Sequence, residues 1–245
     1  MIEQYDSDYL KKNFFSIGVN LNEQQISQFL LYYDTLIEWN SFMNLTTIIE
    51  YEDVVRKHFV DSVSLIKAIS DLNEKKYSII DIGTGAGFPG IPLKIVFPNL
   101  NFVLLDSLNK RINFLNHIIS VLDLKNIIAI HGRAEDIARQ SDKRENFDLC
   151  VSRAVANLSV LSEYCIPFVK NNGYFISYKS EKVKEECDKA KTAINVLGGK
   201  YEKQIDFFLP ESDIYRNLVV IKKIKSSPAK FPRKAGVPTK EPILT

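Results

Sequence analysis

Apolar and polar residues follow two different periods along this chain, and the change of period divides it into two parts. In the first part, apolar residues recur at helical spacing from Ile26 onward. They follow Asn22, whose spacing to Gln25 fits a capping box. The pattern predicts amphipathic helices over residues 22–40 and 51–69, within a helical appendage that covers residues 1–75.

From Tyr77 onward, short apolar runs alternate with helical patterns, which is typical of βαβ units in a parallel sheet. Two further apolar runs lie close together after the last long helix and predict an antiparallel pair. We expect strands near residues 78–82, 102–106, 126–130, 147–152, 173–178, 201–208 and 217–224. The chain is therefore predicted to be an α/β protein with a mostly parallel sheet over residues 76–225.

Composition agrees with a globular enzyme or binding protein, because 45% of the 245 residues are hydrophobic. No apolar run approaches the roughly 18 residues that span a bilayer, and the first residues resemble no signal segment. We therefore expect a cytoplasmic protein without membrane contact. The three cysteines, Cys150, Cys165 and Cys187, have no zinc-ligand spacing and support neither a metal site nor a disulfide framework.

Positive charge gathers near the end of the chain. Residues 222–240 contain seven Lys or Arg and no acidic residue, with prolines between several of them. Residues 226–245 are predicted to be an extended basic tail, in which Lys230, Arg233 and Lys234 contact a polyanion. A solvated tail without a partner is the alternative.

The glycine-dense stretch S-I-I-D-I-G-T-G-A-G-F-P-G, residues 78–90, carries the strongest chemical signal. It predicts a strand that ends near Asp81 and feeds a loop in which Gly83, Gly85 and Gly87 can adopt positive φ. Gly85, Gly87 and Gly90 also satisfy G-x-G-x-x-G, so the loop alone allows a dinucleotide dehydrogenase, or a tight turn without ligand.

The residues that flank the loop favour another cofactor. Asp106 ends the next apolar run, 21 residues after Gly85, where an acidic residue can meet ribose hydroxyls. An acid before the first glycine, the order G-x-G-x-G and a second acid after strand two are similar to the S-adenosylmethionine motifs of Rossmann-like methyltransferases. Asp81, Gly83, Gly85, Gly87, Phe88 and Asp106 are therefore candidate cofactor residues.

Later strands add further candidates at the same edge of the sheet. Ala134 and Glu135 in H-G-R-A-E-D follow the third strand, where methyltransferases commonly bind the adenine edge. Arg153 follows the fourth strand and is the candidate catalytic or substrate-binding residue. The cations predicted to contact RNA in the main domain are Lys110, Arg111, Arg133 and Lys179.

His58 and Asp61 lie three residues apart and so share one helical face. An Asp-oriented histidine could serve as a general acid or base. A packing role for His58 is the favoured interpretation, because a lone histidine on an apolar stripe usually packs.

Six segments in this order resemble one methyltransferase family: W-N-S-F-M-N-L-T, H-F-V-D-S, D-I-G-T-G-A-G-F-P-G-I-P-L, L-L-D-S-L-N-K-R, G-R-A-E-D and V-S-R-A-V-A. The chain resembles the ribosomal RNA small subunit methyltransferase G family, also called glucose-inhibited division protein B. The resemblance runs from about residue 20 to the end.

The resemblance implies a class I S-adenosylmethionine-dependent fold, with seven mostly parallel strands and helices on both faces. It implies methylation of N7 of one guanine in the 530 loop of 16S rRNA, with this RNA or the small ribosomal subunit as partner. We expect the protein to be a monomer. The cofactor contacts that it implies are Gly83, Phe88, Asp106, Ala134, Glu135 and Arg153.

Three other functions are separable by simple measurements. A dehydrogenase would be stabilised by a nicotinamide cofactor. A methyltransferase for small molecules or proteins would not need the basic tail. An RNA-binding module would bind RNA with steep salt dependence but would show no cofactor-dependent turnover.

Overall fold

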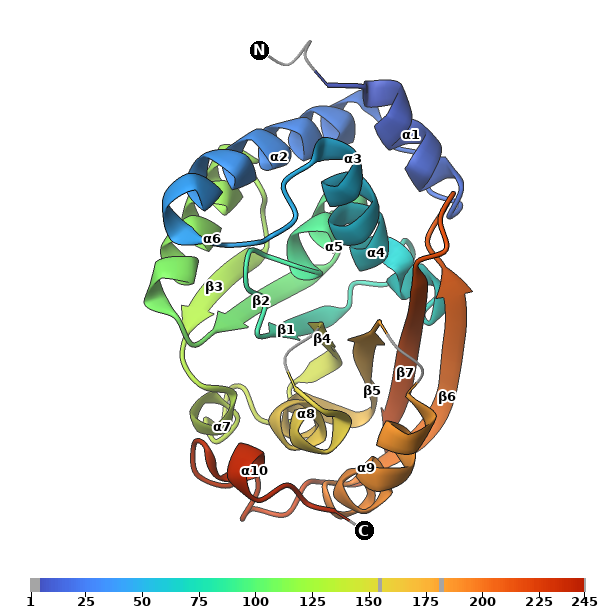
Figure 1. Ribbon diagram of the computed structural model, residues 1–245. Helices are drawn as coiled ribbons and strands as arrows, with labels where there is room; N and C mark the ends of the chain where they lie inside the picture. Colours follow the sequence, from blue (N-terminus) through green and yellow to red (C-terminus); the bar gives the residue numbers. More distant parts are fainter. Residues whose placement is uncertain (1–4, 154–155, 181–182, 245) are drawn as a thin grey trace.

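The computed structural model describes residues 5–153, 156–180 and 183–244, and a seven-stranded sheet with helices on both faces forms its centre (Figure 1). The strands lie in the order β3-β2-β1-β4-β5-β7-β6. They are β1 (Ser78–Ile82), β2 (Asn101–Asp106), β3 (Ile127–His131), β4 (Phe147–Arg153), β5 (Val169–Lys179), β6 (Gly199–Phe208) and β7 (Tyr215–Lys223).

Strands β1 to β5 are parallel to one another, whereas β7 runs antiparallel to both β5 and β6. This arrangement confirms the predicted fold class, including the antiparallel final pair. The order reverses at β1, whose neighbours are β2 and β4. In an open α/β sheet, that reversal places a ligand crevice outside the carboxyl ends of these strands.

Helices cover the sheet in two layers (Figure 1). One layer consists of the N-terminal helices together with α5 and α6, and the other contains α7, α8, α9 and α10. The helices are α1 (Ser7–Phe15), α2 (Glu23–Met43), α3 (Tyr51–Val54), α4 (Asp61–Val63), α5 (Gly90–Val96), α6 (Asn109–Val121), α7 (Ala134–Ile137), α8 (Leu158–Cys165), α9 (Lys184–Val196) and α10 (Val237–Lys240). The pattern analysis did not predict α1.

The predicted helix over residues 51–69 is present as far as Lys67, but its geometry is not regular. A π-helix, Val55–Val60, separates α3 from α4, and a 3₁₀ turn, Ser64–Lys67, follows. Arg153 explains the irregularity, because its guanidinium donates to the carbonyls of Lys57 and His58, at 3.3 and 3.4 Å. A side chain that binds helix carbonyls in this way favours a local π-bulge.

The N-terminal helices share one hydrophobic cluster with a face of the sheet. Phe29 of α2 and Phe59 of the π-helix are fully buried, as are Leu104 of β2 and Val151 of β4, and all four belong to that cluster. The capping box at the start of α2 is present as predicted. Burial of apolar side chains on the N-terminal helices and on the sheet therefore fixes these helices against the glycine loop.

The segment after β7 does not extend freely as predicted. It crosses beneath the second helix layer and ends in α10 beside α8 (Figure 1). Lys223, a basic residue at the end of β7, is buried and binds Glu145 at 3.1 Å. Burial lowers its pKa to about 8.

Among the helices described, none is long and apolar enough to cross a membrane.

Tyr32→Phe tests the contact between α2 and the glycine loop. The fully buried Tyr32 hydroxyl donates to the carbonyl of Ala86, which the substitution would leave without this partner. We expect the free energy of unfolding to fall by about 1–3 kcal/mol, measured by urea denaturation. Tyr201→Phe on the exposed side of β6 is the control and should change it by less than about 0.5 kcal/mol. Equal effects would contradict this account.

Candidate functional site

The glycine loop turns sharply between β1 and α5. Gly83, Gly85 and Gly87 all have positive φ, at 70°, 63° and 97°. A Cβ at Gly87 would lie 2.9 Å from the hydroxyl oxygen of Tyr32, so this position also requires glycine for space. The predicted positive φ at these three glycines is confirmed, and the backbone of the loop can approach a ligand closely.

Asp81 lies behind the loop. Its carboxylate accepts hydrogen bonds from the Thr84 hydroxyl at 2.7 Å and from the Gly90 amide at 2.9 Å. The side chain is fully buried, and burial raises its pKa to about 7 despite these donors. Asp81 therefore shapes the loop and the start of α5, and it is absent from the described linings of the two cavities below.

Asp106 connects β2 with both the loop and α6. Its buried carboxylate accepts from the amides of Gly85 and Leu108, each at 2.9 Å, and pairs with Arg111 at 3.2 Å. A carboxylate can accept about four hydrogen bonds. Asp106 therefore keeps capacity for a ligand hydroxyl at the position where the sequence predicted ribose binding.

Two cavities meet at the carboxyl edge of the sheet and share Gly83, Asp106 and Ser107 in their walls. The larger, the first cavity, has a volume of about 830 Å³, and the smaller, the second cavity, about 260 Å³. Gly85, Phe88 and Arg153 line the first cavity, whereas Ala134 and Glu135 line the second. An elongated ligand could occupy both cavities, with Asp106 near its middle.

The second cavity has a carboxylate that faces a nucleoside-sized space. Glu135 is 5% exposed and accepts the amide of Gly236 at 3.0 Å. Arg133, one of the predicted RNA contacts, precedes α7 and also lines this cavity. The predicted adenine residues Ala134 and Glu135 thus lie together, at a position suited to one end of a ligand.

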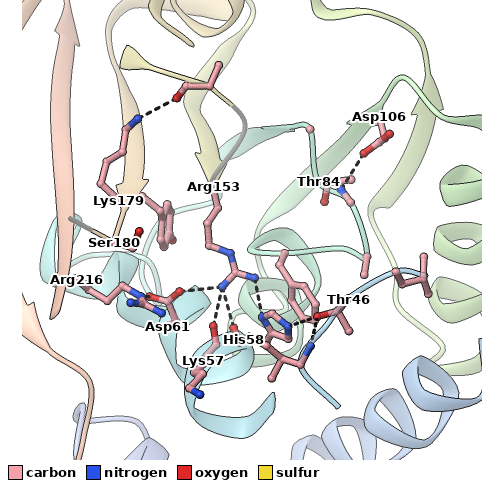
Figure 2. Close-up of a pocket in the computed structure, with 18 of the residues that line it drawn as sticks. Thr46, Lys57, His58, Asp61, Thr84, Asp106, Arg153, Lys179, Ser180 and Arg216 are labelled. Carbon is pink, nitrogen blue, oxygen red and sulfur yellow. Dashed lines mark hydrogen bonds and ion pairs between the residues drawn. The ribbon is translucent and has the colours of Figure 1, made fainter. Parts of the chain in front are cut away.

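Arg153 is the centre of a cationic wall in the first cavity (Figure 2). Its guanidinium pairs with Asp61 at 3.0 Å and lies 5.0 Å from the ring centre of Phe88. Asp61 also pairs with Arg216 at 3.1 Å. One buried carboxylate therefore holds two guanidiniums, and the group keeps a net positive charge toward the cavity.

His58 contacts Arg153 instead of the Asp61 carboxylate that the sequence suggested. Its Nδ1 lies 3.3 Å from Nη2 of Arg153, and its Nε2 lies 2.9 Å from the Thr46 hydroxyl (Figure 2). Because a guanidinium only donates, Nδ1 accepts and the proton of a neutral ring belongs on Nε2. The ring also stacks on Phe88.

Burial lowers the pKa of His58 to about 3, and the charge of Arg153 contributes in the same direction. The imidazole is therefore neutral at physiological pH. Its contacts with Arg153, Thr46 and Phe88 suit a packing and positioning role, in line with the favoured interpretation of the sequence.

The other predicted cations differ in their surroundings. Arg111 and Lys179 line the first cavity, and Lys179 pairs with Glu186 at 2.7 Å. Lys110 points instead toward the end of α2, where it donates to the carbonyl of Met43 at 3.3 Å. Lys230 and Lys234 are exposed, whereas Arg233 pairs with the buried Glu163 at 2.7 Å.

Sequence reasoning missed several residues that line the cavities. Arg216 lies near the start of β7, Tyr178 near the end of β5 and Thr46 three residues after α2, so only the fold brings them to one place. Tyr164 and Thr239 line the second cavity together with Gly236. The arginine in Y-R-N-L-V-V, directly before an apolar strand, was the one sequence signal available for Arg216.

Metal binding finds no support in the described part of the chain, where no group of three or more His, Cys, Asp or Glu could hold an ion. Cys150 and Cys165 are buried thiols, and burial raises the pKa of Cys150. Carboxylates, guanidiniums and backbone of the glycine loop line the two cavities.

Comparisons with known proteins agree with this geometry. The family model described as rRNA small subunit methyltransferase G matches residues 25–215. Proteins named ribosomal RNA small subunit methyltransferase G from Lachnoclostridium phytofermentans and Acetivibrio thermocellus are 57% and 53% identical to this chain. The alignments cover 94% of both chains in the first case and 92% in the second.

A solved structure is similar in fold. It is a SAM dependent methyltransferase from Aquifex aeolicus, with a TM-score of 0.52 and 16% sequence identity. The match covers 74% of this chain and 97% of the other. At this identity the likeness concerns the fold alone.

The low pKa of His58 predicts a specific acid sensitivity. The unfolded chain binds a proton near pH 6.5, whereas the folded chain does so only near pH 3. His58 therefore does not reduce the free energy of unfolding above pH 6.5. As the pH falls from 6.5 toward 3, that free energy decreases by at most about 1.4 kcal/mol per pH unit. Urea unfolding between pH 7.5 and 5 should show a shallower decline for His58→Gln than for the wild type.

His117→Gln, at an exposed histidine on α6, is the matched control and should keep the decline of the wild type. An unchanged pH dependence in His58→Gln would contradict the neutral, buried state of this ring.

Proposed function

Because the chain belongs to the rRNA small subunit methyltransferase G family, we propose that it methylates N7 of one guanine in the 530 loop of 16S rRNA, with S-adenosylmethionine as methyl donor. The observation that carries this proposal is the pair of joined cavities at the carboxyl edge of the sheet. The Asp106 carboxylate lines their shared region, Glu135 lines the second cavity, and the cationic wall lines the first. The carboxylates suit a nucleoside cofactor, and the cationic wall suits an RNA substrate.

The residues present suit this cofactor. Asp106 retains acceptor capacity near the junction of the cavities, where ribose hydroxyls can donate to it. Glu135 and Ala134 suit the adenine end in the second cavity, and Gly83 and Gly85 offer backbone without a Cβ. We assign cofactor contact to Gly83, Gly85, Phe88, Asp106, Ala134, Glu135 and Arg153, and support of the loop to Asp81 and Gly87.

S-adenosylmethionine supplies an electrophilic methyl group when it is bound. Guanine N7 offers a lone pair and loses no proton on methylation, so the reaction needs no general base. The neutral His58, with both ring nitrogens engaged, agrees with that requirement. The chain then acts mainly by orientation: Arg153, fixed by Asp61 and Phe88, can hold the base edge or an adjacent phosphate.

RNA recognition is assigned to cations around the first cavity and at the end of the chain. Arg111, Arg133 and Lys179 lie at the cavities, and Lys110 lies near the end of α2. Lys230 and Lys234 are exposed, whereas the predicted contact at Arg233 competes with its pairing to Glu163. Phosphate contacts of this kind predict binding that weakens steeply with salt.

We further propose that residues 1–75, 76–225 and 226–245 contribute differently to one cytoplasmic monomer. The N-terminal helical region supplies Thr46, His58 and Asp61 to the first cavity, which supports a role in substrate positioning. The Rossmann-like region supplies the glycine loop and Asp106. The C-terminal region supplies exposed cations for 16S rRNA or the assembled small subunit.

The direct test uses methyl-labelled S-adenosylmethionine and small ribosomal subunits that lack methylation in the 530 loop. After incubation with the purified protein, the RNA is digested and the labelled nucleoside is identified. We expect labelled 7-methylguanosine from that loop. Label in another nucleotide or another RNA would contradict the proposed acceptor, and a thermal shift with a nicotinamide cofactor instead would favour the oxidoreductase alternative.

Arg153→Ala tests the orienting role. Removal of the guanidinium should lower the single-turnover transfer rate by about 10²-fold or more, because the substrate would lose its alignment. Arg56→Ala is the matched control, since Arg56 contacts Tyr9 and lies outside the described lining of both cavities. Full transfer rate and RNA affinity in Arg153→Ala, with cofactor binding intact, would show that the assignment is wrong.

A further inference from the structure

The C-terminal strap, residues 227–240, is anchored at its first residues to the body of the protein. Arg144 donates to the carbonyls of Ser227 at 2.8 Å, Pro228 at 3.2 Å and Phe231 at 2.8 Å. The side chain of Phe231 is 6% exposed and belongs to the hydrophobic cluster under the second helix layer. The first part of the strap is thus held by both hydrogen bonds and apolar burial.

A second anchor joins the strap to α8. Glu163 is 1% exposed, and its carboxylate accepts from the Arg233 side chain at Nη2 (2.7 Å) and Nε (3.0 Å). The backbone amide of Arg233 donates to the same carboxylate at 2.7 Å. Removal of one partner from a buried ion pair leaves the other charge uncompensated, so this contact strongly favours the docked strap.

Beyond these anchors the strap reaches the second cavity. The Gly236 amide donates to Glu135 at 3.0 Å, and the Thr239 hydroxyl lies 2.9 Å from the hydroxyl of Tyr164. Gly236 and Thr239 line the cavity on one side, and Ala134, Glu135 and Tyr164 line it as well. Gly236 has a φ of 84°, which glycine adopts without strain.

We infer that the C-terminal strap is the outer wall of the adenine subsite, and that binding of the nucleoside cofactor depends on its docking. The inference rests on the proposed function, because it takes the second cavity to hold adenine. Gly236 orients the carboxylate of Glu135, and Thr239 with Tyr164 closes the side that would otherwise open to solvent.

This role differs from the attraction of RNA by the basic tail. Arg233 faces inward to Glu163, whereas Lys234 and Lys240 on the same strap are exposed. The exposed positive charges and the docking contact of the strap therefore belong to different residues. A strap that only attracted RNA would leave cofactor affinity unchanged when Arg233 is removed, whereas a strap that forms the subsite would not.

The first measurement is calorimetric binding of S-adenosylhomocysteine in the absence of RNA. We expect Arg233→Ala to weaken binding at least tenfold, because the strap loses the anchor nearest the cavity. Lys240→Ala removes an exposed positive charge from the same strap and should change affinity less than twofold. Circular dichroism checks that each variant is folded.

The second measurement needs no variant. Trypsin can cleave the wild-type chain after Lys230, Lys234 and Lys240 when the strap is undocked, and mass spectrometry identifies the C-terminal fragments. A ligand that binds only the docked form reduces the undocked population, so saturating S-adenosylhomocysteine should slow these cleavages at least fivefold. This result decides the question if Arg233→Ala does not fold.

The outcomes separate the two claims. No binding of S-adenosylhomocysteine to the wild-type protein would overturn the proposed cofactor. Normal wild-type binding with equal affinity in folded Arg233→Ala would overturn the strap inference and leave the proposed function standing. Unchanged cleavage in the presence of bound ligand would likewise overturn the strap inference.

Discussion

The buried carboxylate of Asp61 holds the candidate active site together. It lies at the start of α4 and binds Arg153 from β4 and Arg216 from β7, so one side chain joins the N-terminal helices to two strands. Two guanidiniums so close together would repel each other without a carboxylate between them. Loss of one partner in such a buried group typically costs about 3–5 kcal/mol, and it would also disorder the cationic wall of the first cavity.

The same group explains the irregular helix before α4. Arg153 donates to the carbonyls of Lys57 and His58 as well as to Asp61, and the π-helix presents those carbonyls to it. The contacts of Arg153, including its ion pair with Asp61, therefore determine the helix geometry in this segment. His58, carried by the same turn, is fixed between Arg153 and Thr46 in its neutral form.

The glycine loop depends on support from two sides. Asp81 binds Thr84 and Gly90 from beneath, and Tyr32 binds the carbonyl of Ala86 from the helical layer. The loop presents its remaining face to the cavities, where Asp106 binds the amide of Gly85. A flexible, glycine-dense segment is thus held in one conformation by carboxylates and a tyrosine from three elements.

The sequence alone determined the α/β fold, the seven strands and the positions of the glycine loop, Asp106, Glu135 and Arg153, because periodicity and strand-end residues are local properties of the chain. It did not determine the π-helix, the docking of the C-terminal strap or the grouping of Arg153 with Asp61 and Arg216. These features depend on ion pairs between residues up to 155 positions apart, as between Asp61 and Arg216. No local pattern encodes such pairs, so only the tertiary structure decides them.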